Sequence, residues 1–347
     1  MGITKDIKAE LGRRVAFATE EAFLDERIRP FLNGHGHEKL DVRVVQLDST
    51  GAATVEVRPD VGPAVFAKFF PPGTEGQAIF DKLGALRAAG LGDGSDYQVV
   101  EPLGYLPELD LLVCREAAGP SVADVLAGDD AEAGLDAVRR AATWLGRLHS
   151  LPVRIGQPHS MIVSTEILSL TRRLAKVAAE RPEVVPTAVG MVEQLERLSY
   201  DTVDGLATQS HGQYRPIHVF LGDRVGPPDD RRSVTTVIDL DRSRPADPAR
   251  DTAEFLHRLR RQLSGAGRGD AAVEGATNAF MEAYCDTVPD AEAWTANLRF
   301  HWARYVFHSM NRKLKKGSTP EDEEAVETYK ADFAALVDGR LLAGWVR

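Results

Sequence analysis

The pattern of apolar positions changes from helical to alternating early in the chain. Between residues 5 and 32 apolar side chains recur at largely helical spacing, which predicts one or two helices that end at the Asn-Gly-His-Gly run of 33–36. Beyond this run, apolar and polar residues alternate in three short segments separated by turns that contain Asp and Gly. We therefore expect three antiparallel strands, at 42–47, 53–57 and 64–70.

One helix and two more short apolar runs follow these strands. Residues 75–89 show helical periodicity that a glycine ends. The runs 97–100 and 111–114 flank the Pro- and Gly-containing segment 102–107, and we expect them to complete a five-stranded sheet with one helix. Residues 115–120 would then link this sheet to a second lobe.

The rest of the chain is predicted to be mostly helical. Amphipathic periodicity appears at 135–150 and, after it, in six further segments. These lie at 168–178, 187–198, 252–263, 271–285, 292–310 and 320–336. The predicted organisation is an N-terminal helical extension at 1–34, a sheet-containing lobe at 35–116 and a helical lobe at 117–347.

Composition and charge limit the classes of protein to which this chain can belong. A chain of 347 residues, 43% hydrophobic and 27% charged, can bury a sizeable core and suits two lobes better than one. The formal net charge of −10 argues against a nucleic-acid binder, because the only short basic run is 312–316. The acidic balance is compatible with a cationic acceptor such as an amine-bearing sugar.

The sequence indicates neither a membrane anchor nor an oxidising compartment. Cys114 and Cys285 lie far apart and suggest neither a disulfide framework nor a metal motif. The N-terminus lacks the apolar core of a signal peptide, and no stretch stays apolar for the roughly 18 residues that a bilayer span requires. We expect a cytoplasmic protein without nucleic-acid or membrane partners, and its oligomeric state stays open.

A His-Gly loop that contains Gln213 and His218 carries the most specific pattern in the chain, and Asp239 follows it after an apolar strand. Together they resemble the aminoglycoside phosphotransferase and choline kinase family over about residues 40 to 315. Gln213 stands where that family has its catalytic Asp, and His218 stands where it has Asn. Asp239 falls on the family's metal-binding Asp, and 247–251 resembles the Asp-Pro-x-x-Asp turn that follows it.

This resemblance implies an α+β, two-lobed protein-kinase-like fold, with a small antiparallel-sheet N-lobe and a mostly helical C-lobe. It also implies an ATP-dependent phosphotransferase, with GTP as the other candidate nucleotide and Mg²⁺ or Mn²⁺ as the metal. The acceptor would be a hydroxyl of a small molecule, such as an aminoglycoside, sugar, amino alcohol or other natural product, or of a peptide. The sequence does not choose among these acceptors.

Lys68 closes an apolar strand and resembles the family's lysine that reaches the nucleotide phosphates. An inward-facing ammonium needs a partner, for which Glu75, at the start of the next helix, is the first candidate and Asp81 the second. The alternatives are a Lys68 that faces solvent and a Glu75 that complements the helix dipole.

Two further segments are assigned to the nucleotide by the same resemblance. The turn 48–52, with a single glycine, would cover the phosphates. The linker residues Arg115, Glu116 and Ala117 would offer backbone groups to adenine, a kind of contact that leaves little trace in sequence.

Asp239 is predicted to hold a metal ion. It lies at the exit of the apolar strand 234–238, where carboxylate oxygens can meet a hard cation, and turn formation is the alternative. Asp241 would be a second ligand or would support the first. His218 would also be a metal ligand, one that suits Zn²⁺ or Mn²⁺ better than Mg²⁺; contact with phosphate or substrate, and space filling, are its alternatives.

His149, His211 and Asp251 are expected to act structurally. In the family the residue equivalent to His211 braces the loop, and we expect Asp251 to cap a helix that begins at Thr252 while it helps to hold the loop. Aromatic residues of the following helices could line an acceptor pocket, although periodic aromatics are usually core. These are Phe280, Tyr284, Trp294, Phe300, Trp302 and Tyr305.

The amide at Gln213 leaves two functions open. An amide cannot take a proton as a carboxylate does, but its oxygen can accept a hydrogen bond from a hydroxyl and hold it in line. The first hypothesis is a phosphotransferase slowed by roughly 10²–10⁴-fold. The second is a catalytically impaired protein that binds a nucleotide or another ligand, or acts as a scaffold. A chance origin of the pattern is disfavoured by the joint order of Lys68, the His-Gly loop and Asp239.

Overall fold

The computed structural model divides the chain into two compact units. One unit comprises Met1–Gly119 and Gly222–Asp241, and the other comprises Pro120–Leu221 and Arg242–Arg347. The segment 222–241 thus belongs to the first unit although it follows much of the second in sequence. The structure describes residues 2–32, 39–47, 52–71, 74–159, 163–179, 182–203, 205–223, 233–316, 319–342 and 345.

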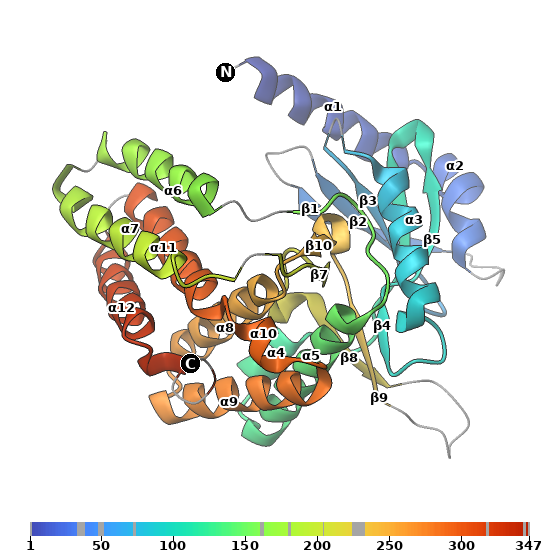
Figure 1. The fold of residues 1–347 in the computed structure, drawn as a ribbon. Coiled ribbons are helices and arrows are strands. Elements are labelled where there is room, and N and C mark those ends of the chain that lie inside the picture. Colours follow the sequence, from blue (N-terminus) through green and yellow to red (C-terminus); the bar gives the residue numbers. More distant parts are fainter. Residues whose placement is uncertain are drawn as a thin grey trace. The chain divides into compact units, whose positions relative to one another are not determined.

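The first unit contains a five-stranded antiparallel sheet, as predicted, with strand order β1-β2-β3-β6-β5. Helix α3 (Gly76–Leu86) lies alongside this sheet (Figure 1) and continues into a π-helical turn, Arg87–Leu91. The strands are β1 (Leu40–Leu47), β2 (Ala53–Pro59), β3 (Val65–Phe69), β5 (Pro102–Leu106) and β6 (Leu111–Arg115).

The fifth strand of the sheet differs from the one that the apolar pattern predicts. The run at 97–100 forms β4 (Tyr97–Val99), which pairs in parallel with β9 (Ser233–Val237). The segment 102–106, which we had expected to be a turn, forms β5 and is the fifth strand of the sheet. Pro102 is compatible with this strand because it stands at the first position, where proline is tolerated. Gly104 follows an irregularity in register, and a Cβ there would lie 2.5 Å from the Phe31 ring. Pro102 and Gly104, which suggested a turn, therefore belong to a strand, and Pro107 begins the 3₁₀ turn that follows it.

The N-terminal helices cover one face of this sheet. They are α1 (Gly2–Ala18), α2 (Glu21–Phe23), a π-helical turn (Leu24–Ile28) and a 3₁₀ turn (Arg29–Leu32). Leu11, Val15 and Ile28 are buried in one cluster with apolar residues of the sheet that include Val55 and Ala67. The alternating apolar residues of β2 and β3 thus pack on the face of the sheet that these helices cover.

The second unit is mostly helical. Its amphipathic helices pack mainly through α5 with α9, and through α11 with α8 and α12 (Figure 1). The helices are α4 (Val122–Ala127), α5 (Ala131–Ser150), α6 (Val163–Ala178), α7 (Val185–Ser199), α8 (Ala249–Gly265), α9 (Asp270–Thr287), α10 (Ala291–Thr295), α11 (Leu298–Lys316) and α12 (Pro320–Val337). A short antiparallel pair, β7 (Thr208–Ser210) and β10 (Arg244–Ala246), accompanies them.

The predicted helix at 292–310 is two helices, α10 and α11. Asn297 lies in the break, where its side-chain oxygen accepts from the N–H of Val203 and its amide nitrogen donates to the carbonyl of Val203 and to Asp247. These bonds hold Asn297 between the helices and explain the interruption of a continuous apolar period.

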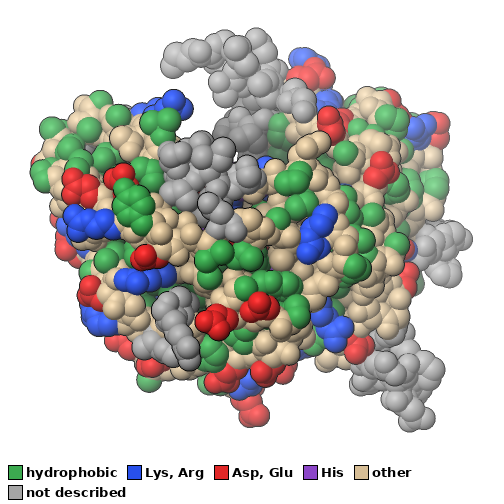
Figure 2. Space-filling model, viewed as in Figure 1, with side chains coloured by type: hydrophobic (Ala, Val, Ile, Leu, Met, Phe, Trp, Pro, Cys, Tyr) green, Lys and Arg blue, Asp and Glu red, His purple; other side chains and the backbone are tan. Residues whose placement is uncertain are grey.

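Charges of both signs are interspersed on the face of the molecule in view, over α6 and α7 among other elements (Figure 2). Of the helices that the structure describes, none is both long enough and apolar enough to cross a membrane.

Candidate active site

Lys68 and two aspartates form a compact ionic group in the first unit. Lys68 lies in β3, Asp239 follows β9, and Asp241 lies in the 3₁₀ turn Leu240–Arg242. Lys68 Nζ is 2.5 Å from Oδ1 of Asp239 and 2.7 Å from Oδ2 of Asp241. The three side chains are only 23–30% exposed. The structure thus provides the partner that an inward-facing lysine requires.

The two carboxylates favour the charged form of Lys68. Burial lowers the pKa of Lys68, but the carboxylates of Asp241 and Asp239 outweigh it and raise the pKa above its ordinary value. Lys82 of α3 donates to the backbone carbonyl of Asp241 at 3.2 Å. Two ammonium groups therefore meet the segment 239–241, which carries both carboxylates.

Asp239 has a backbone conformation that most residues avoid. Its φ angle is 65°, in the left-handed region, which costs free energy for a residue other than glycine but is tolerated by Asp. Such strained positions are concentrated at functional sites. The observation agrees with the metal-binding role predicted for Asp239, which stays a prediction.

Glu75, the first candidate partner of Lys68, is exposed at the beginning of α3 and its side chain does not cap that helix. Asp81, the second candidate, accepts from Gln77 at 2.9 Å. The ion pairs of Lys68 described in this structure go to Asp239 and Asp241, and the pairing with Glu75 remains a prediction. Sequence reasoning had treated Asp241 only as a companion of Asp239.

The linker residues are held by the sheet. Arg115 Nε donates to Glu101 at 2.5 Å, and the carboxylate of Glu116 accepts from Arg58 at 2.6 Å and from the N–H of Ala64 at 2.9 Å. The backbone N–H of Glu116 donates to the carbonyl of Ala64 at 3.0 Å. These bonds hold the segment 115–117 in place at the sheet. The adenine contacts predicted for Arg115, Glu116 and Ala117 stay a prediction.

The predicted phosphate-covering turn, 48–52, lies outside the described residues except for Ala52, which precedes β2.

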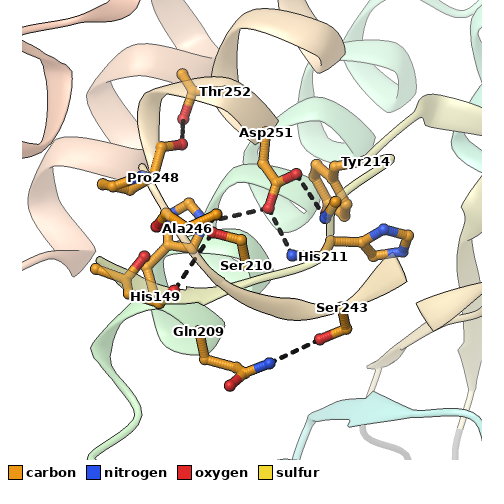
Figure 3. A network of polar contacts seen from close by, with 12 residues as sticks. His149, Gln209, Ser210, His211, Tyr214, Ser243, Ala246, Pro248, Asp251 and Thr252 are labelled. Atoms are coloured by element: carbon orange, nitrogen blue, oxygen red, sulfur yellow. Dashed lines mark hydrogen bonds and ion pairs between the residues drawn. The ribbon is translucent and has the colours of Figure 1, made fainter. Parts of the chain in front are cut away.

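The second unit contains the His-Gly loop, and a buried carboxylate holds its backbone. Asp251 accepts from the N–H of His211 at 2.6 Å and from that of Gly212 at 2.9 Å, and it lies 3.4 Å from Nε2 of His149 (Figure 3). Burial raises the pKa of Asp251, but the hydrogen bond and charge of His149 help to bring it below its ordinary value. His149 and His211 are fully buried, which agrees with the structural roles expected for them.

The prediction that Asp251 caps a helix beginning at Thr252 is wrong. Helix α8 begins at Ala249, so Asp251 lies in its first turn and its carboxylate is committed to the loop. Asp247 instead accepts from the N–H of Ala249 at 2.9 Å. The cap and the loop bond, which the sequence pattern merged into one residue, are separate tasks of the two aspartates of the Asp-Pro-x-x-Asp turn.

Gly212 has to be glycine. Its φ angle is 85°, and a Cβ built on it would lie 2.4 Å from the carbonyl oxygen of Arg242. Tyr214, two residues on, is fully buried, stacks on Trp144 at 5.6 Å between ring centroids and donates to the carbonyl of Ala141 at 2.8 Å. The loop is therefore fixed on both sides of Gln213.

Gln213 is tied to a charged neighbour. In the amide orientation that satisfies both groups, its oxygen accepts from both terminal nitrogens of Arg215, at 2.9 and 2.6 Å. Arg215 Nε donates to Glu254 at 2.6 Å, and the hydroxyl of Tyr305 donates to the same carboxylate at 3.1 Å. Sequence reasoning missed Arg215 and Glu254; the only available signal was an arginine inside the loop.

His218 contacts the loop itself. Its Nδ1 lies 3.0 Å from the carbonyl oxygen of Gln213, and its ring stacks on that of His211 at 5.8 Å between centroids. This contact supports the loop, and metal ligation by His218 stays a prediction.

A five-stranded antiparallel sheet with one following helix, joined to a helical unit that carries this loop, is the fold of kinase-like phosphotransferases. Residues 43–295 match the phosphotransferase enzyme family known as APH, and the chain therefore belongs to that family.

Several solved structures share the fold at low sequence identity. An aminoglycoside-3'-phosphotransferase of type VIII is 20% identical, with a TM-score of 0.53 over 82% of this chain and 98% of its own. A glucosamine kinase is 14% identical, with a TM-score of 0.61 over 92% and 85%. Choline kinase from Cryptosporidium parvum Iowa II is 10% identical, with a TM-score of 0.58 over 94% and 97%. No curated protein sequence matches the chain.

Proposed function

We propose that the protein is a nucleotide-dependent phosphotransferase that phosphorylates a hydroxyl of a small molecule or peptide, with ATP or GTP as donor. In this reaction the bond from the γ-phosphorus to the bridging oxygen breaks and the nucleoside diphosphate leaves with that oxygen. A bond from the γ-phosphorus to the acceptor oxygen forms, and the proton of the acceptor hydroxyl passes to solvent water. The observation that carries the proposal is the contact of Lys68 with Asp239 and Asp241 in a chain of this family.

The residues fit a nucleotide and a hard divalent ion. Magnesium is usually held by one or two carboxylates together with substrate phosphates, and Asp239 with Asp241 offers such a pair. The ion would neutralise charge on the phosphates, and Lys68 would turn from the carboxylates to them. Manganese is the ion that would also suit an imidazole ligand, the role predicted for His218.

Gln213 would position the acceptor. Since phosphoryl transfer depends mainly on positioning and electrostatics, an amide in place of a carboxylate slows the reaction without abolishing it. The amide oxygen now accepts from Arg215, so it must leave that guanidinium to accept from a hydroxyl. The proteins of known structure with this fold are named for aminoglycosides, glucosamine and choline, which supports a small-molecule hydroxyl as the acceptor.

The alternative is a catalytically impaired protein that binds a nucleotide or another ligand, or acts as a scaffold. The observation that favours it is the same bond between Gln213 and Arg215, which occupies the only side-chain oxygen at the position of the family's base.

The first test is a thermal-shift titration with ATP and GTP, each with Mg²⁺ or Mn²⁺. The melting temperature of wild type should rise when nucleotide and metal are added together. At a nucleotide concentration a hundredfold above Kd, binding adds about 2.7 kcal/mol to the free energy of unfolding. The control Lys330→Ala, which changes a surface residue paired with Glu327, should show the same rise. Lys68→Ala should lose this gain. The absence of a shift with every nucleotide and metal in folded wild type contradicts the proposed function.

Gln213→Asp distinguishes the two functions. A carboxylate beside Arg215 should stay ionised and accept the acceptor's proton, so a working but slow enzyme should gain up to roughly 10²–10⁴-fold in kcat. A nucleotide shift without turnover in either variant, across a panel of acceptor hydroxyls, favours the binding protein.

A further inference from the structure

The second unit contains a basic cluster that the proposed phosphate-transfer residues do not include. Arg244 of β10, Arg250 of α8 and Arg304 of α11 belong to it, together with His159 before α6 and His308 of α11. The backbone N–H of His159 donates to the carbonyl of Pro245 at 2.8 Å, which holds that loop against β10.

Part of this basic cluster is buried without hydrogen-bond partners. Arg304 is 6% exposed, and its Nη1 donates to Glu166 at 3.1 Å. Its Nε and Nη2 atoms, with Nη1 of Arg250 and Nε2 of His159, are buried and have no hydrogen-bond partner among the described residues. Buried polar atoms of this kind cost free energy unless water or a ligand satisfies them, and the guanidinium nitrogens among them can only donate.

Positive charge dominates the surroundings. Burial and the charges of Arg250 and Arg244 lower the pKa of His159 to about 4, and burial and Arg304 lower that of His308 to about 3. Two carboxylates lie in the same region. Glu166 accepts from Arg304 and lies 3.8 Å from Nε2 of His159, and Asp247 is already bonded to Asn297, His301 and the N–H of Ala249. They leave the guanidinium groups in excess.

A chain of contacts connects the basic cluster with Gln213. The guanidinium of Arg304 lies 4.8 Å from the ring centroid of Tyr305, whose hydroxyl donates to Glu254. Glu254 bonds Arg215, which bonds Gln213. Arg250 is also the chain neighbour of Asp251, which holds the loop backbone. Helix α8 therefore carries Arg250 of the basic cluster together with Asp251 and Glu254, which bond residues of the His-Gly loop.

We propose that the basic cluster binds an anionic group, a carboxylate or a phosphate ester, of the acceptor whose hydroxyl is phosphorylated, a proposal that rests on the proposed function. Guanidinium groups match the two oxygens of such groups with paired hydrogen bonds. Exposed Arg244 would admit the anion, and Arg250 with Arg304 would complete its binding. An amine-bearing acceptor, which the net charge of the chain suggested, would be repelled here.

The test is a titration with inorganic phosphate at constant ionic strength, followed by thermal shift and calorimetry. Choline serves as the cationic comparison. Wild type, Lys68→Ala and the exposed control Arg139→Gln should bind phosphate, whereas Arg244→Gln and Arg250→Gln should weaken binding about tenfold or more, the loss of one charge-assisted hydrogen bond or more. Choline should give no shift in any variant.

Two results overturn the proposal. One is no phosphate binding by wild type, and the other is binding that Lys68→Ala removes while Arg244→Gln and Arg250→Gln retain it, which places the anion at the nucleotide residues. Arg244 is exposed, so its variant decides the matter if Arg250→Gln does not fold. If nucleotide still raises the melting temperature but phosphate does not bind, only the proposed anionic acceptor is refuted. The proposed function is refuted only if nucleotide also fails to raise the melting temperature.

Discussion

At the scale of single residues, Asp251 ties the His-Gly loop to helix α8. One carboxylate, 1% exposed, holds two consecutive backbone N–H groups of the loop and contacts His149 (Figure 3). Because a buried charge without its bonds is costly, this arrangement fixes the loop before any substrate arrives.

Asp251→Asn should lower the free energy of unfolding by about 3 kcal/mol, since the amide loses the charge and offers one acceptor oxygen where two were used. Urea unfolding followed by tryptophan fluorescence measures the loss. Asp136→Asn, exposed on α5, is the matched control and should change stability little. Equal effects of the two substitutions would show that the loop is not held by this carboxylate.

At the scale of elements, the N-terminal helices are part of the core of the first unit. Leu11 and Val15 of α1 are buried with residues of β2 and β3, including Val55 and Ala67. Lys68 lies in β3 between two residues of this buried cluster, Ala67 and Phe69. The packing of α1 therefore supports the strand that positions the lysine.

Leu11→Ala should destabilise the first unit by about 2–5 kcal/mol, because it leaves a cavity where a side chain is 2% exposed. Arg13→Ala, whose side chain is 70% exposed, should have little effect. All four tryptophans, Trp144, Trp294, Trp302 and Trp345, belong to the second unit. Faster hydrogen exchange of β3 amides with an unchanged tryptophan transition is expected, and unchanged exchange would contradict it.

At the scale of the whole molecule, one buried and two half-buried neutral histidines make stability depend on pH. Burial, with nearby arginines, lowers the pKa of His159 to about 4 and of His257 and His308 to about 3. Between these values and the ordinary value of 6.5 the unfolded chain binds more protons than the folded chain. The contribution of these histidines to the free energy of unfolding is therefore complete above pH 6.5. It decreases as the pH falls from 6.5 toward 4.

Urea unfolding at several pH values between 7 and 4, followed by tryptophan fluorescence, should show this decrease. His257→Asn should reduce the slope by up to about 1.4 kcal/mol per pH unit, the contribution of one proton. A wild-type profile that is flat between pH 6.5 and 4, or one that His257→Asn leaves unchanged, would contradict the assignment.

Local sequence determined the types of most elements, because amphipathic and alternating periods report directly which side of a segment is buried. It also determined the family resemblance, carried by the His-Gly loop and Asp239 within one short stretch of chain. It misplaced β5 and merged α10 with α11, because Pro102, Gly104 and Asn297 take their roles from partners elsewhere in the chain.

Only the tertiary structure decided which charges meet. Lys68 is paired with Asp241 as well as Asp239, and Arg215 joins Gln213 to Glu254. The basic cluster lies in a chain whose net charge is −10. Contacts between residues far apart in sequence leave no period, and a net charge averages over the surface. The local field of a site therefore follows from packing, which the sequence specifies only through the whole fold.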